Sequence, residues 1–148
     1  MAQKPTRRLA REWAVQMLAA CDLNPGQDLD AEIDALWEQL ASADETLSVG
    51  GKALKQLKLF AEERVKGVIA NREEIDGILA PLLEDWELDR LGTVERAVLR
   101  MGVWEMKFSD VPAPVVINEA VDLVNWFSGP KSRSIVNGVL DRYAKSAR

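Results

Sequence analysis

The stretch Leu91-Gly-Thr-Val-Glu-Arg-Ala-Val-Leu-Arg-Met-Gly-Val-Trp-Glu105 decides the fold class. Apolar residues occupy about half of its positions and fall on nearly every side of a helix, with only four charged residues among them. A helix that is apolar almost all round is buried among other helices, whereas a surface helix shows one apolar stripe. We therefore predict a helix from Val94 to about Lys107, capped by Thr93, at the centre of a helical core.

Two further helices are predicted downstream of this central helix. Pro112 and Pro114 suit the first turn of a helix, which then carries apolar residues at spacings of three and four. Ser128-Gly129-Pro130 breaks that helix, and residues 131–134 are expected to form a loop. This loop leads into a last helix, whose apolar residues are Ile135, Val136, Val139, Leu140 and Tyr143.

The first helix of the chain is expected to have two different faces. Thr6 is predicted to cap it, and Asn24-Pro25-Gly26 stops it after about Leu23. At about 100° per residue, one side forms an apolar stripe and the cations fall on the opposite side. The apolar face is therefore expected to pack against the rest of the protein, and the other face to present positive charge to solvent. The stripe is Leu9, Trp13, Met17 and Ala20, and the cations are Arg7, Arg8 and Arg11, joined by Lys4 if the helix reaches that far.

Three more helices are predicted between the first helix and the central one. The second covers about residues 29–40, a loop covers 42–51, and a long third helix follows. Asn71 and Glu74 resemble a capping box that starts a short fourth helix, which Pro81 ends or kinks. The sequence thus predicts an all-α protein, a compact bundle of about seven helices with short connections.

The composition argues against most kinds of catalytic site. The 148 residues are 47% hydrophobic, enough for a core, and include one cysteine and no histidine. Without histidine the chain lacks the commonest general base and nearly all zinc sites, and a lone cysteine forms no internal disulfide. No apolar run approaches the roughly 20 residues of a membrane span. We expect a cytoplasmic protein that is not an enzyme and uses no metal or cofactor.

Charge is distributed unevenly along the chain, whose net charge is −5. Residues 1–11 contain lysine and arginine but no acid, whereas residues 22–46 contain Asp and Glu but no Lys or Arg. A basic arm on an acidic body can concentrate an RNA at one place, and the acidic body suits a basic protein partner. The charge pattern alone leaves RNA binding and an ordinary solvated helix face equally open.

Tryptophan is distributed over both halves of the chain, and most of the five lie at apolar helix positions, where we expect them in the core. Trp86 and Trp126 lie near predicted helix ends, where partial exposure is expected.

A family signature is spread over several stretches that follow one another in order. In order and spacing they resemble the NusB family, and the resemblance spans nearly the whole chain, being weakest over residues 22–50. Each stretch alone is a weak signal, but several in register form a strong one. The stretches are 91–105, Val111-Pro-Ala-Pro-Val-Val-Ile-Asn-Glu-Ala-Val-Asp-Leu-Val124, Val136-Asn-Gly-Val-Leu-Asp141, the arginine-rich 7–18 and the middle segment 67–81.

The resemblance implies a fold and a function. The fold is a single domain of residues 1–148 made of two three-helix halves, about 1–83 and about 84–148. The function is transcription antitermination: such proteins bind boxA-type single-stranded RNA as a heterodimer with the ribosomal protein NusE. That complex joins RNA polymerase and other Nus factors and supports transcription of ribosomal RNA. We expect the same partners here.

Two basic groups are the candidate RNA contacts. The resemblance places Lys4, Arg7, Arg8 and Arg11 on the RNA-binding first helix, where guanidinium groups can pair with phosphates and stack on bases. It also places the turn with Lys131 and Arg133 near the RNA. There the family often has an acid at the position of Lys131 and Phe at that of Ile135. The lysine should strengthen phosphate binding, whereas losing the aromatic removes a stacking platform worth roughly 1–3 kcal/mol.

The other polar residues of the signature are interpreted as structural rather than catalytic. Charged and amide groups on apolar helices are usually paired with each other or with helix ends. We predict a network joining the last three helices, made of Arg100, Glu105, Asn118, Glu119 and Asn137.

Glu95, in the first turn of the central helix, keeps two interpretations. It either contacts the ribosomal partner or interacts favourably with the helix dipole. Two other functions also stay open for the chain as a whole. One is a helical adaptor that binds only proteins, for which RNA binding would depend little on salt. The other is a carboxylate-based enzyme, which would require turnover sensitive to a single Asp or Glu substitution.

Overall fold

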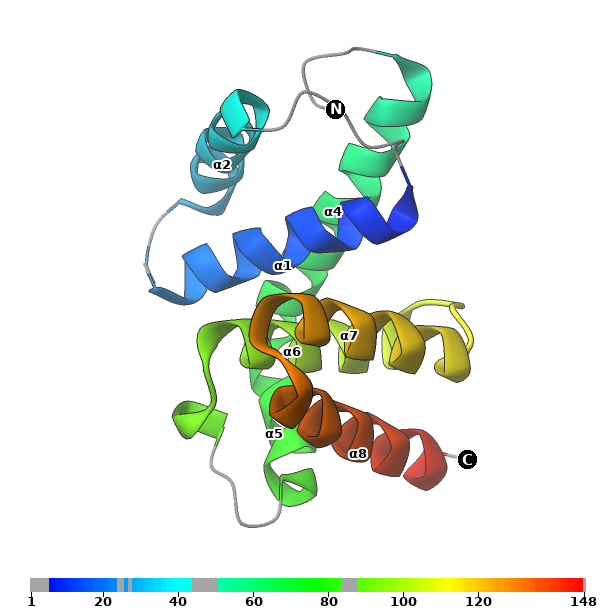
Figure 1. Ribbon diagram of the computed structural model, residues 1–148. Coiled ribbons are helices and arrows are strands. Elements are labelled where there is room, and N and C mark those ends of the chain that lie inside the picture. Colours follow the sequence, from blue (N-terminus) through cyan, green and yellow to red (C-terminus); the bar gives the residue numbers. More distant parts are fainter. Residues whose placement is uncertain (1–5, 24–25, 27, 44–50, 84–87, 148) are drawn as a thin grey trace. The chain divides into compact units, whose positions relative to one another are not determined.

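The computed structural model describes residues 6–23, 26, 28–43, 51–83 and 88–147. These residues form seven α-helices and one 3-10 helix, with no strand among them (Figure 1), which confirms the all-α prediction. In the part of the chain that is described, no helix is long and apolar enough to cross a membrane. The helices are α1 (Arg7–Leu23), α2 (Leu29–Ala43), α4 (Lys52–Ala70), α5 (Arg72–Leu82), η1 (Leu88–Arg90), α6 (Thr93–Phe108), α7 (Ala113–Ser128) and α8 (Pro130–Ser146).

The chain divides into two compact units, Met1–Lys66 and Gly67–Arg148. The division lies within α4, upstream of the boundary expected near residue 83. Each unit has its own set of buried apolar side chains.

In the first unit, α1 is buried on more than one side. Thr6 caps it as predicted, because its Oγ1 accepts a hydrogen bond of 3.2 Å from the Leu9 N–H. Trp13 meets Trp37 of α2 edge to face, with ring centroids 5.6 Å apart. The prediction of one buried stripe and one open face is therefore wrong for the middle of this helix. Its buried residues are Leu9, Ala10, Arg11, Trp13, Ala14, Val15, Met17 and Leu18.

In the second unit, α6 is the central helix, as predicted from its sequence. Every residue from Ala97 to Glu105 is buried, and the helix contacts α5, α7 and α8. Two glycines allow close packing around it. A Cβ on Gly102 would lie 2.9 Å from Leu140 Cδ1, and a Cβ on Gly67 would lie 2.2 Å from Trp104 Nε1. Neither position therefore has room for a side chain.

Three helix ends differ from their predictions. Thr93 is the first helical residue rather than the cap, and Gly92 precedes it without a capping side chain. Asn71 does precede α5, but its side chain donates to the Gly67 carbonyl at 2.8 Å and so closes the end of α4. The capping box is therefore wrong, although the boundary is right. Pro81 lies inside the last turn of α5.

The connection between α7 and α8 is shorter than expected. Gly129 alone separates the two helices, and its φ of 92° suits glycine because other residues rarely adopt it. Pro130 then occupies the first helical position, where its missing N–H costs nothing. The prediction that residues 131–134 form a loop is wrong, since they belong to the first turns of α8.

Candidate nucleic-acid interface

The start of α1 presents Arg7 and Arg8 as exposed side chains. Its first turn contains no acid. The N-terminus of a helix carries partial positive charge, so cations there do not stabilise the helix through its dipole. They add instead to a local positive potential that attracts anions. Lys4, the third cation predicted for this surface, lies outside the described residues.

Arg11 does not share this exposed surface, contrary to its predicted place on the open face. Only 4% of the residue is exposed, and its guanidinium lies 5.1 Å from the centre of the Phe60 ring. The physical reason is that the side of α1 opposite the apolar stripe is also covered, with Phe60 of α4 against it. Arg11 therefore belongs to the interior of the first unit.

Phe60 is the centre of a cluster of three arginines that the sequence did not reveal. Arg7 lies 5.2 Å and Arg64 3.4 Å from the centre of its ring, in addition to Arg11. Arg64 is only 2% exposed, and it also pairs with Glu63 at 3.0 Å. Guanidinium groups stack favourably on aromatic rings. The ring thus orders Arg7, which loses less rotamer freedom when it binds an anion.

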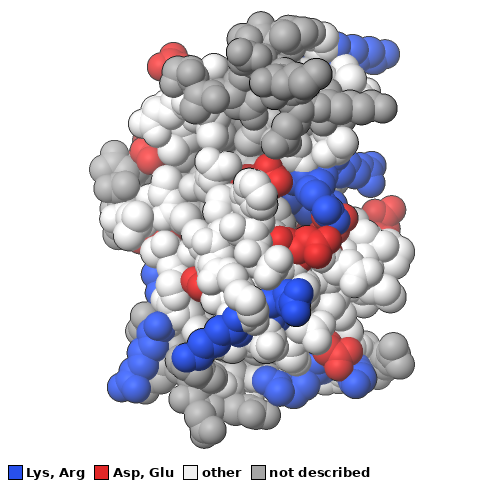
Figure 2. All heavy atoms as spheres, in the orientation of Figure 1, with Lys and Arg blue, Asp and Glu red and all other residues white. Residues whose placement is uncertain are grey.

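The first turns of α8 present a second pair of exposed cations, Lys131 and Arg133. No acid lies in the first turn of this helix. The intervening Ser132 is directed elsewhere, since its hydroxyl donates to Glu95 Oε1 of α6 at 2.8 Å. Figure 2 shows Lys and Arg side chains at the surface of each unit, with acidic side chains close to some of them.

Glu95 connects the start of α6 to the start of α8. Partial burial raises the pKa of this carboxyl, but hydrogen bonds from Ser132, its own backbone and Ser128, together with nearby Arg96, outweigh burial and lower the pKa below its ordinary value. Glu95 is therefore charged at neutral pH and lies in the first turn of α6, where the helix dipole favours an anion.

Arg100, one of the five residues predicted to form a network joining the last three helices, pairs with a helix that the prediction left out. Arg100 forms a two-pronged pair with Asp76 of α5, with Nε–Oδ1 2.8 Å and Nη2–Oδ2 3.1 Å. Glu105 is buried and Glu119 half-buried, but Asn118 and Asn137 are exposed, so these two amides are not part of a buried network. Because α6 lies between α5 and the later helices, a charged residue on it can face either side.

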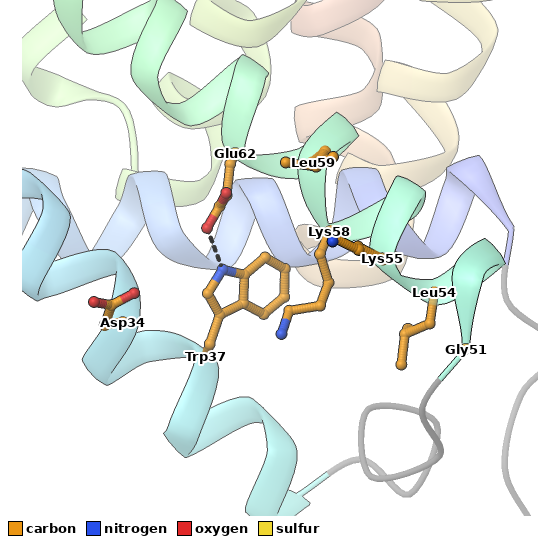
Figure 3. Close-up of a pocket in the computed structure, with 8 residues that line it drawn as sticks. All are labelled: Asp34, Trp37, Gly51, Leu54, Lys55, Lys58, Leu59 and Glu62. Carbon is orange, nitrogen blue, oxygen red and sulfur yellow. Dashed lines mark hydrogen bonds between the residues drawn. The ribbon is translucent and has the colours of Figure 1, made fainter.

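A hollow of about 500 Å³ opens between α2 and α4 (Figure 3). Trp37 lies at its centre, with its Nε1–H donated to Glu62 at 2.8 Å and Lys58 Nζ 5.0 Å from its ring. Two acids and two lysines line it together, so it favours neither sign of charge. Among the described residues, no group of three or more His, Cys, Asp or Glu is placed to hold a metal ion.

Comparisons with known proteins agree with one another. A model of the NusB family matches residues 8–145. The chain is 38% identical to a transcription antitermination protein NusB from Edwardsiella ictaluri, covering 96% of this chain and 94% of that protein. It is 35% identical to the protein of the same name from Clostridium botulinum, covering 92% and 97%.

Solved structures give the same result. The structure of T. maritima NusB is similar with a TM-score of 0.76 and 31% identity, covering 97% of this chain and 93% of that one. A crystal structure of the antitermination factors NusB and NusE in complex with dsRNA contains a chain with a TM-score of 0.77 and 32% identity, covering 95% and 96%. From its sequence and its fold together, this chain belongs to the NusB family.

Proposed function

We propose that this protein is a cytoplasmic transcription antitermination factor that binds boxA-type single-stranded RNA together with ribosomal protein NusE. It does no chemistry of its own. It assembles these partners with RNA polymerase and other Nus factors during transcription of ribosomal RNA. The observation that carries the RNA-binding part is the pair of exposed arginines, Arg7 and Arg8, at an acid-free helix start.

The distribution of charge over the helix starts supports an anionic ligand. Helices α2, α5 and α6 have acids in their first turns, as the helix dipole favours. Helices α1, α4, α7 and α8 have none. Of these, α1 starts with the exposed pair Arg7 and Arg8, and α8 has the exposed pair Lys131 and Arg133 in its first turns. Those cations weaken the favourable charge distribution of their own helices. A phosphate backbone that binds there reverses this cost.

The relatives support the assignment to transcription. Similar proteins are named transcription antitermination proteins, and one neighbouring structure contains NusB and NusE in complex with dsRNA. RNA contact by a few cations is weak alone, and a second protein that binds both this chain and the RNA raises the affinity through effective concentration. Glu95 is a charged residue at which a basic ribosomal protein can dock, in addition to its hydrogen bond with Ser132.

The test is a fluorescence anisotropy titration with single-stranded boxA-type RNA at several salt concentrations, with and without NusE. The natural protein is compared with Arg7→Ala/Arg8→Ala. We expect the double variant to bind more weakly and to lose roughly 0.7 of salt slope for each phosphate contact removed. A duplex of the same sequence and a scrambled single strand measure the preference for strandedness and sequence.

A control variant separates local contact from net charge. Lys66→Ala/Lys145→Ala removes two partly exposed cations that pair with Asp30 and Asp141. It changes net charge by the same amount and should bind RNA like the natural protein. Equal losses in both double variants would mean that the arginines act only through net charge. RNA binding that depends little on salt and is unchanged in both would favour an adaptor that binds only proteins.

A further inference from the structure

Trp126 exposes an unusually large aromatic surface. It lies near the end of α7 and is 77% exposed, the highest value among the large apolar side chains that the structure describes. Tryptophan buries more apolar area than any other side chain when it is covered, so leaving it open forgoes stabilisation. The exposure confirms the expectation for this position, and the adjacent Phe127 is 38% exposed, so two aromatic side chains are open at this end of α7.

The charge around Trp126 identifies the chemistry of that ligand. The chain turns at Gly129 directly after α7, so Trp126 and the exposed Lys131 and Arg133 flank one short turn. From Leu123 to Leu140 the sequence contains no acid. The acid that does approach from α6, Glu95, is hydrogen-bonded to Ser132. An open aromatic face beside cations is complementary to a nucleotide, which has a flat base and an anionic phosphate.

Trp37, which lines the hollow between α2 and α4, and Trp126 differ in whether they can receive a base. Trp37 is buried, donates its N–H to Glu62 and has Lys58 over its ring (Figure 3). Trp126 has its ring in solvent, and its neighbours along the chain are the exposed Asn125, Phe127 and Ser128. An exposed aromatic ring with exposed cations and no acid nearby in the sequence suits a nucleotide.

We propose that Trp126 is a stacking platform for one base of the bound single-stranded RNA, while Lys131 and Arg133 contact the adjacent phosphates. The proposal rests on the proposed function and adds a base contact to it. Ile135 of α8, close to these cations in the sequence, is half-buried and offers no aromatic face for stacking.

The experiment uses the full chain with NusE and compares Trp126→Ala and Trp126→Phe with the natural protein. We expect Trp126→Ala to bind boxA-type RNA roughly 5- to 100-fold more weakly, and Trp126→Phe to keep most of the affinity. The salt slope should be unchanged, because no phosphate contact is lost. Val115→Ala, which trims another exposed apolar residue of α7, should have no effect.

A base-deletion series locates the contact. RNAs with a single abasic position are titrated against the natural protein and Trp126→Ala. Removing the base at one position should weaken RNA binding by the natural protein. The same removal should not change the RNA affinity of Trp126→Ala, since both changes remove the same stacking contact. Circular dichroism melting checks that the variants fold, and Trp126→Gln provides a second variant without an aromatic ring.

The outcomes are distinguishable. Full RNA affinity in a folded Trp126→Ala, with weakened binding in Arg7→Ala/Arg8→Ala, would overturn the stacking platform and leave the proposed function standing. If Trp126→Ala no longer binds NusE in the absence of RNA but keeps its RNA affinity, this surface is a protein contact. That result would also overturn the stacking platform. If the natural protein binds no RNA with or without NusE, both proposals fail.

Discussion

The starts of α1 and α8 are both basic, yet the structure uses their charges differently. At α1 the aromatic ring is half-buried: Phe60 lies against three guanidinium groups, and two of those arginines are buried. At α8 the aromatic residue lies outside: Trp126 is open to solvent beside exposed cations. Arginine can therefore serve the core or the surface within one helix. Which it does is decided by the neighbouring helix, not by the basic run in the sequence.

The largest expected loss of stability comes from breaking the ion pair between Arg100, a cation that stabilises the fold, and Asp76. Asp76→Ala leaves a nearly buried guanidinium without this carboxylate, which should lower the free energy of unfolding by about 3 kcal/mol. Arg100→Met should lower the free energy of unfolding by less, because the substitution removes the buried guanidinium itself. Urea denaturation measures both. Unchanged stability of Asp76→Ala would contradict a structural role for this pair.

The next largest expected effect is that of substituting Phe60, which tests the role of the aromatic ring at α1. Phe60→Ala removes the ring that three arginines share and should destabilise the protein by about 2–3 kcal/mol, less than for a fully buried ring because Phe60 is half-buried. It should also weaken RNA binding, since Arg7 loses the surface that orders it. Phe60→Tyr keeps the ring and should restore both properties. An RNA affinity that does not change in folded Phe60→Ala would show that the ring does not position Arg7.

A substitution at Gly67 tests whether a packing defect that changes no charge affects RNA binding. Gly67→Ala places a Cβ against the Trp104 ring and should cost about 1–3 kcal/mol of stability. RNA affinity in the folded variant should stay at the natural value, because no cation at α1 or α8 is changed. Thermal melting and the RNA titration together check this. A matched Gly77→Ala, at a position where a Cβ meets nothing, should not destabilise the protein.

The smallest effect concerns Glu95 and pH. The pKa of its carboxyl is lowered in the folded protein, so the charged form adds stability above the ordinary value of 4.5, and this contribution is lost as pH falls through the lower folded value. Glu95→Gln should therefore be slightly less stable than the natural protein at pH 7, and the difference should shrink on acidification. Urea denaturation at pH 7 and at pH 3 measures it. A difference that grows on acidification would contradict the sign of the shift.

The sequence predicted the fold well because helix periodicity is a local property. The apolar run from Ala97 to Glu105 identified the buried central helix, and the proline and glycine positions gave most helix ends to within a few residues. Helix ends failed where one backbone group decides them: Thr93 was one residue too late to cap, and Asn71 bonded backwards to α4. Such choices depend on local geometry that a residue type alone does not fix.

The candidate site was less predictable because it depends on contacts between helices. Arg7, Arg8, Lys131 and Arg133 are exposed, as expected from their positions, but Arg11 is buried because α4 covers that side of α1. Phe60 and Arg64 were missed, although an aromatic four residues before an arginine is a signal for stacking on a helix. Asp76 was missed as the partner of Arg100 because the two residues are far apart in the chain.

The central claim is that exposed cations bind RNA and that the buried one does not. One measurement tests it directly: the salt dependence of RNA affinity, with NusE present, for Arg7→Met/Arg8→Met, Lys131→Met/Arg133→Met and Arg11→Met. We predict a slope reduced by roughly 0.7 per phosphate contact in the first two variants and unchanged in a folded but less stable Arg11→Met. A slope reduced in Arg11→Met and unchanged in the other two would contradict the account.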